Sequence, residues 1–84
     1  MRMTVSLQEL IELEHEAVSS YRIWSVSAMD VQRKLDAATD RDKPFYKDLL
    51  EHDMQLVEKA RTNMATTRRD LAKYFRDLLE ENVA

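Results

Sequence analysis

Acidic side chains and a histidine lie close together early in the chain, at a spacing that suits metal binding. Glu12 and His15 are three residues apart, so on a helix they share one face. Carboxylate and imidazole groups of this kind ligate iron or zinc. Both residues fall outside the apolar stripe described below, and the other histidine, His52, reads as a rim residue. We therefore interpret the two histidines as solvent-exposed side chains.

The elements that position these residues are predicted to be helices. Glycine is absent, Pro44 is the only proline, and strong helix formers dominate the composition. The first helix opens on a capping box, Ser6-Leu7-Gln8-Glu9, and the only turn-like stretch is Thr39–Pro44. On each side of that turn, apolar residues recur every three or four positions; the two stripes are Leu7, Leu10, Ala17, Tyr21, Trp24, Ala28, Val31 and Leu35, then Tyr46, Leu50, Val57, Ala60, Met64, Leu71, Tyr74 and Leu78.

These patterns predict an all-α fold, an antiparallel two-helix hairpin that forms one domain over residues 1–84. The first helix covers about residues 6–38, the turn residues 39–43, and the second helix about residues 44–80. A turn this short makes the helices neighbours, with residue i facing roughly residue 80−i. Two amphipathic helices bury little surface by themselves, so we expect two hairpins to dimerise into a four-helix bundle.

Two acids, Glu14 and Asp53, interrupt the apolar stripes. A carboxylate between packed helices needs a partner, so each acid marks a polar contact that fixes the register, lies at an end of the bundle, or is a metal ligand. The first helix resembles that of ferritin-like di-iron proteins, which carry a Glu, a small residue at i+3 and a Tyr at i+7, here Glu14, Ala17 and Tyr21. The resemblance implies a Glu-x-x-His motif on the second helix at the same level. Residues 66–69 occupy that level and are Thr66, Thr67, Arg68 and Arg69, so we predict no metal and no cofactor, with a ferritin-like metal-binding bundle as the alternative.

Composition and charge argue against several other classes of function. Cysteine is absent, which removes disulfides and thiolate chemistry, and no apolar stretch approaches the length of a membrane span. The net charge is −3, too mild to imply nucleic acid or anionic lipid as a partner. An acidic block in residues 9–16 and a basic stretch in residues 59–76 are expected to lie side by side, brought together by the hairpin or by a partner chain. We expect a cytoplasmic protein with neither nucleic acid nor membrane as a partner, and not an enzyme.

The middle of the first helix is apolar on nearly every side, which one neighbouring helix cannot cover. Aromatic and methionine side chains in such a segment favour protein interfaces. The predicted partner-binding residues are Tyr21, Ile23, Trp24, Val26, Met29 and Val31. We expect the partner to be a second copy of the chain, another protein, or both.

The sequence therefore predicts a small non-enzymatic interaction module: an adaptor, a chaperone or an inhibitor that acts through an apolar helix face. A structural subunit of a larger helical assembly is the other possibility. The size and two-helix build are similar to those of small type III secretion co-chaperones and needle-type subunits, an analogy of architecture alone.

Overall fold

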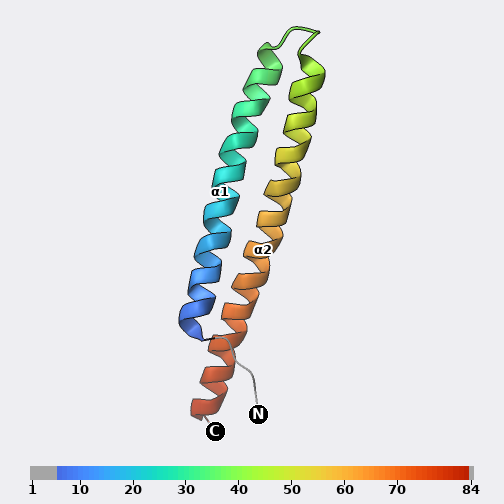
Figure 1. The fold of residues 1–84 in the computed structure, drawn as a ribbon. Helices are drawn as coiled ribbons and strands as arrows, with labels where there is room; N and C mark the ends of the chain where they lie inside the picture. The colour runs from blue at the N-terminus through green and yellow to red at the C-terminus, as the bar shows by residue number, and fades with distance from the viewer. Residues whose placement is uncertain (1–5, 84) are drawn as a thin grey trace.

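The structure, a computed structural model that describes residues 6–83, consists of two antiparallel helices. Helix α1 spans Leu7–Ala37 and helix α2 spans Lys43–Val83. They lie side by side and are joined by one short connection (Figure 1). The described residues include no strand. The predicted all-α hairpin is thus confirmed.

Each helix begins where its sequence supplies a suitable first residue. Ser6 has an extended backbone, and its Oγ accepts a hydrogen bond from the amide of Glu9 at 3.1 Å, which is the serine half of the capping box. In the connection, the Thr39 carbonyl accepts hydrogen bonds from the amides of Asp42 and Lys43, both at 3.0 Å. Pro44 is the second residue of α2. Amide groups in the first turn of a helix have no carbonyl partner within the helix, so the lack of an amide hydrogen in proline costs no hydrogen bond there.

Helix α2 continues to Val83, three residues beyond the predicted end near residue 80. Glu80 and Glu81 favour an end near residue 80, because acidic residues interact poorly with the negative end of the helix dipole. That penalty is only about 0.3–1 kcal/mol for an exposed charge. The leucines and glutamates of this segment are good helix formers, and their summed propensity outweighs the penalty.

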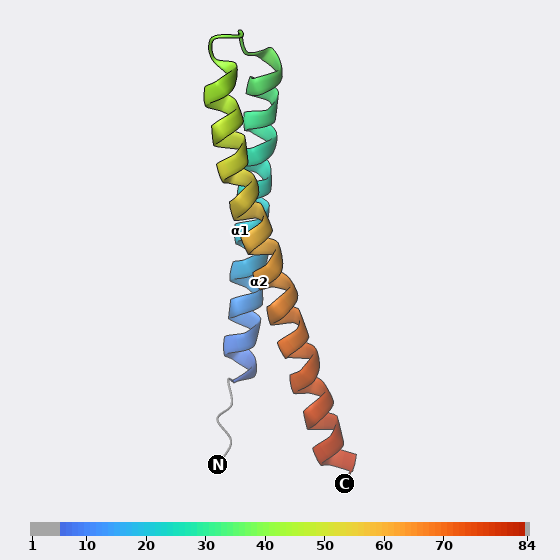
Figure 2. The same cartoon turned by 90° about the vertical axis from the view of Figure 1, so that its right-hand side faces the viewer.

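The molecule is a rod, with extents of 66 × 20 × 15 Å. Its radius of gyration is 19.0 Å, whereas a compact domain of this length has a value of about 12 Å. Figure 2 shows the helices crossing near their middle, and α2 extends beyond the start of α1 at the end far from the turn. Neither described helix has an apolar stretch long enough to cross a membrane.

The core is a narrow seam between the helices. Its buried apolar residues are Leu10, Ala17, Ala28, Val31 and Ala60. Three of these five are alanines, which allow the backbones to approach closely but bury little apolar area each. Among the described residues no large side chain is fully enclosed. The larger members of the two stripes, such as Trp24 and Val57, remain half-buried because residues 6–83 supply no third helix to cover them.

Two polar contacts across the seam define the register. Ser27 on α1 donates a hydrogen bond to Asp53 on α2 at 2.7 Å, which matches the predicted register. Arg68 on α2 donates to Glu14 on α1 at 3.2 Å, two residues away from that register. The acidic block and the basic stretch therefore do lie at the same end of the hairpin, with Glu14 and Arg68 as a direct pair.

Removal of the α1 cap tests the local origin of this helix. Ser6→Ala should lower the free energy of unfolding by about 1 kcal/mol, because the Glu9 amide loses its acceptor. Thermal unfolding followed by circular dichroism measures the change. Thr62→Ala, at an exposed position inside α2, is the matched control and should be neutral or slightly stabilising. Equal losses in the two variants would contradict the capping role.

Candidate protein-interaction surface

The predicted partner-binding residues separate into three groups in the structure. Ile23, Val26 and Met29 are 63%, 59% and 65% exposed and lie on the outer surface of α1. Tyr21 and Trp24 are half-buried. Val31 is only 5% exposed, because it belongs to the stripe that packs against α2. The structure therefore leaves the first three side chains open to a partner, and it places Val31 in the core of the hairpin itself.

The heptad pattern of α1 explains this separation. In a helix that packs along a neighbouring helix, residues seven apart lie on the same side. Two of every seven residues point into the seam between the helices, and the others point outward or sideways. Tyr21, Trp24 and Val31 occupy seam positions. Ile23, Val26 and Met29 occupy the remaining outward positions, where polar residues usually stand. The sequence signal at this segment was an excess of apolar residues, which does not by itself say which of them face outward.

One broad face of the hairpin, here called the groove face, carries two shallow apolar grooves that run between the helices. They share Ser25 and follow one another along the seam. The first is lined by Ser25, Ala28, Met29, Gln32, Leu50, Met54 and Val57, and the second by Val18, Tyr21, Arg22, Ser25, Val26, Met64 and Arg68. Met54, which is 52% exposed, stands across the first groove from Met29. Sequence reasoning did not select Met54 as a site residue, although its position directly after a seam residue could have indicated it.

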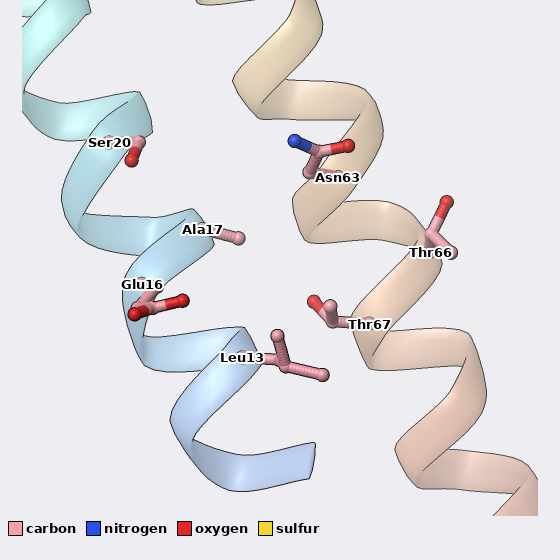
Figure 3. Close-up of a pocket in the computed structure, with 7 residues that line it drawn as sticks. All are labelled: Leu13, Glu16, Ala17, Ser20, Asn63, Thr66 and Thr67. Carbon is pink, nitrogen blue, oxygen red and sulfur yellow. The ribbon is translucent and has the colours of Figure 1, made fainter. Parts of the chain in front are cut away.

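The opposite face, here called the polar face, has a different character. Its hollow is lined by Leu13, Glu16, Ala17, Ser20, Asn63, Thr66 and Thr67. Figure 3 shows Leu13, Ala17 and Thr67 pointing toward one another between the helices, with polar groups around them. Ile23 lies seven residues after Glu16 and so borders this face. In the middle of α1, the exposed apolar residues are thus spread from the polar face at Ile23 to the groove face at Met29.

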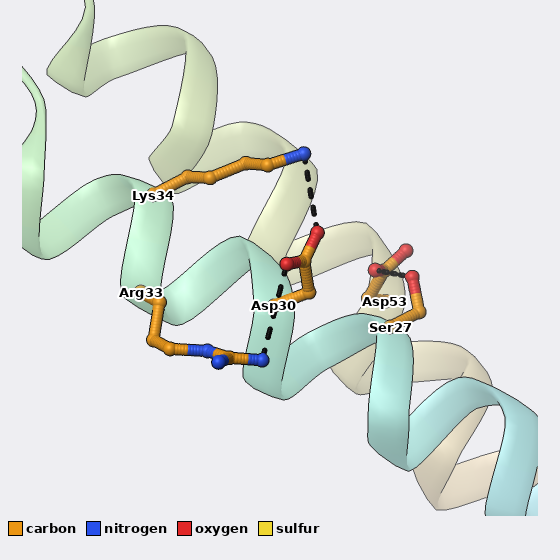
Figure 4. A network of polar contacts seen from close by, with 5 residues as sticks. All are labelled: Ser27, Asp30, Arg33, Lys34 and Asp53. Carbon is orange, nitrogen blue, oxygen red and sulfur yellow. Dashed lines mark hydrogen bonds and ion pairs between the residues drawn. The ribbon is translucent and has the colours of Figure 1, made fainter.

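The buried acid of the seam, Asp53, is 3% exposed and is held by two neighbours. Besides the bond from Ser27 (Figure 4), its other carboxylate oxygen, Oδ1, lies 3.4 Å from Nδ1 of the exposed His52. Asp30, further along α1, lies 3.1 Å from Lys34 and 4.0 Å from Arg33 on the surface. Asp53 therefore takes part in a polar contact across the seam, which is one of the roles that the sequence left open for an acid in the stripe. Its partner Ser27 was missed, because a serine beside the stripe carries no distinctive signal.

The second in-stripe acid, Glu14, forms an ion pair with the half-exposed Arg68. This arginine lies at the level where the ferritin resemblance implies an iron ligand. No group of three or more histidine, aspartate or glutamate side chains that could hold a metal ion is found in the part of the chain that the structure describes. The arrangement at Glu14 is that of a cross-helix ion pair.

The remaining charges lie mainly at the surface. Glu58 accepts a hydrogen bond from Arg61 at 2.8 Å, and this bond raises the pKa of that guanidinium. Among the described residues, Arg22 and Lys47 have no ion-pair partner, and neither has the basic group Arg69, Lys73 and Arg76. Exposed pairs contribute well under about 1 kcal/mol each. The placement of these charges therefore affects the relative orientation of the two helices more than the stability of the hairpin.

Comparison of the chain with protein-family models, with curated proteins and with solved structures gave no match.

Loss of the Ser27 hydroxyl tests the register contact. Ser27→Ala leaves the Asp53 carboxylate without its donor and should cost about 1–3 kcal/mol of unfolding free energy. The measurement is chemical unfolding at one fixed protein concentration, because any association adds to the apparent stability.

Two further variants serve as controls for this prediction. Ser20→Ala, on the polar face, should change stability by less than about 0.5 kcal/mol. Ser27→Ala combined with Asp53→Leu should recover the loss, since replacing both members of a buried polar pair is far less costly than removing one. If Ser27→Ala lost no more stability than Ser20→Ala, the Ser27–Asp53 hydrogen bond would not contribute to the stability of the hairpin.

Proposed function

We propose that this protein is a small, non-enzymatic protein-interaction module that works in the cytoplasm through the exposed apolar surface of α1. The observation that carries the proposal is the exposure of Ile23, Val26 and Met29, each about 60% or more, in the middle of a helix whose inner stripe already contacts α2. Exposed apolar side chains gathered in one region mark binding sites rather than ordinary surface.

The character of these side chains fits protein capture. Isoleucine and valine are stiff and present a fixed shape, whereas methionine adapts to the surface it meets. The neighbouring half-buried Tyr21 and Trp24 supply aromatic area of the kind that dominates binding energy in interfaces. Such a surface suits another amphipathic helix, laid along α1 with its apolar side inward. An adaptor, a chaperone for a helical client and an inhibitor all act by capture of this kind.

Self-association belongs to the same proposal. The hairpin leaves both broad faces of its seam half-covered, and no large side chain of the described residues is fully enclosed. Two hairpins that pack face to face form a four-helix bundle, in which the half-buried stripe residues gain the cover they lack. We propose this dimer as the form that presents α1 to other proteins.

The outer surface of α1 provides the test of capture. Combined Ile23→Asp and Val26→Asp should reduce retention of bound proteins at least tenfold, because a charge in an apolar contact is strongly unfavourable. The measurement is a quantitative pull-down with the immobilised protein, after circular dichroism has shown unchanged helicity.

Gln55→Asp, an equally exposed change on the outer surface of α2, is the matched control and should retain the wild-type set of bound proteins. If the double variant captured the same proteins as the wild type, the α1 surface would not be the binding site.

A further inference from the structure

We infer that the groove face binds an amphipathic helix of another protein, and that this helix carries acidic side chains on both sides of its apolar stripe. The inference rests on the proposed function, because Val26 and Met29 of the exposed α1 surface line the two grooves. It adds the place of the bound helix and the chemistry that selects it. Its starting observation is that the two grooves differ in the residues along their borders.

The two grooves form one trough that fits a single helix. They share Ser25, and together they extend along α1 from Val18 to Gln32. At 1.5 Å per residue this is about 21 Å, or roughly four helical turns. The side chains between the borders are mostly apolar: Tyr21, Ala28, Leu50, Val57 and Met64. A helix laid in this trough contacts both α1 and α2 with its apolar side.

The border of the first groove, nearer the turn, is apolar on both helices. Met29 of α1 and Met54 of α2 are 65% and 52% exposed and stand across the groove from each other. Methionine is flexible and polarisable, so these two side chains can adapt to the surface they meet. This half of the trough therefore requires only apolar side chains in the bound helix.

The border of the second groove, nearer the open end, is basic on both helices. On α1, Arg22 lines the groove and lies seven residues before Met29, on the same side of the helix. On α2, Arg61 and Arg68 lie seven and fourteen residues after Met54, so they continue the border that Met54 begins. Arg68 also lines the second groove.

Arg22 and Arg61 stand on opposite sides of the second groove at nearly the same level. By the register of the contacts across the seam, residue 22 is level with residues 58–60. The hydrogen bond and the charge of Glu58 raise the pKa of Arg61, and Tyr21 in the groove adds a smaller effect in the same direction. The guanidinium of Arg61 therefore lies near the groove as well.

These arginines retain donors for a carboxylate of a bound helix. Arg22 has no ion-pair partner among the described residues. Arg61 donates to Glu58 at 2.8 Å and Arg68 donates to Glu14 at 3.2 Å, each through one nitrogen. A guanidinium has five N–H donors, so each of these arginines can take a second carboxylate. Acidic side chains on both sides of an apolar stripe would meet them.

A second copy of the chain, packed on this face with both turns at the same end, does not provide this match. It would bring Arg61 of the second copy over Arg22, and two-fold symmetry would repeat the contact, so like charges would meet at the second groove. Asp36 and Lys47 of the two copies would pair nearer the turn, but neither residue lines the grooves. A helix with acidic borders meets the basic borders with opposite charge, and we take it as the occupant.

Two synthetic peptides of about 15 residues test the charge selection. Both carry the same leucine and alanine stripe, and the positions on both sides of the stripe are glutamate in one peptide and lysine in the other. The glutamate peptide should bind the full chain at least about tenfold more tightly, as measured by fluorescence anisotropy. The whole chain has a net charge of −3, so general charge attraction would favour the lysine peptide instead.

Charge reversal on both borders should invert this preference. Arg22→Glu combined with Arg61→Glu should weaken binding of the glutamate peptide at least about tenfold and strengthen binding of the lysine peptide, because both borders become acidic. Lys59→Glu combined with Lys73→Glu, at exposed positions on the side of the polar face, makes the same change in net charge. This matched control should leave the order of the two peptides unchanged, and circular dichroism should show equal helicity in all variants.

Equal binding of the two peptides, tighter binding of the lysine peptide, or no binding of either at about 1 mM would overturn the inference. A glutamate-peptide affinity that falls as the protein concentration rises would show that a second copy covers the trough, and would overturn it too. The proposed function fails by a different result, namely protein capture that survives Ile23→Asp combined with Val26→Asp. Loss of charge selection with capture intact would therefore refute only the chemistry of the partner.

Discussion

The hydrogen bond from Ser27 to the buried carboxylate of Asp53 is the contact on which the rest of the arrangement depends. A carboxylate 3% exposed between two helices is tolerated only where a donor meets it. Any slip of one helix along the other would leave Asp53 against apolar side chains and Ser27 without its acceptor. The alanine-rich seam alone would permit several registers of the two helices. The Ser27–Asp53 pair fixes one of them. The Glu14–Arg68 contact lies within two residues of the same register.

A seam between only two helices sets the second constraint. Each helix offers the other a strip of contact, and the small side chains Ala17, Ala28 and Ala60 fill its centre. Close approach of this kind gives a well-defined geometry but removes little apolar area from water. The larger stripe residues on both sides are left half-covered. The incomplete core and the available binding surface are therefore the same feature.

Much of the fold was accessible from the sequence because it is governed by local chemistry and a simple period. The capping serine Ser6, the turn before Pro44 and the two apolar stripes together predicted the hairpin and the register. The cost of burying a charge indicated that Asp53 needs a partner, but it left open whether that partner was a polar side chain or a metal ion. What escaped prediction depends on three-dimensional detail: the partner Ser27, the separation of Val31 from Ile23, and the place of Met54 beside the groove. The end of α2 escaped because weak opposing effects nearly balance there.

The position of the Ser27–Asp53 bond along the rod has a consequence for motion. Ser27 and Asp53 each lie thirteen residues from residue 40 in the turn. The helix segments between the bond and the turn are therefore held together at both ends, by the bond at one end and by the turn at the other. Beyond the bond, toward the open end, the helices are tied mainly by apolar contacts and the exposed pair of Glu14 with Arg68. Opening in a hairpin proceeds most easily from its free end, and amide hydrogens there exchange first. The bond therefore limits how far this opening extends toward the turn. When the helices at the open end separate and close again, they return to the same register.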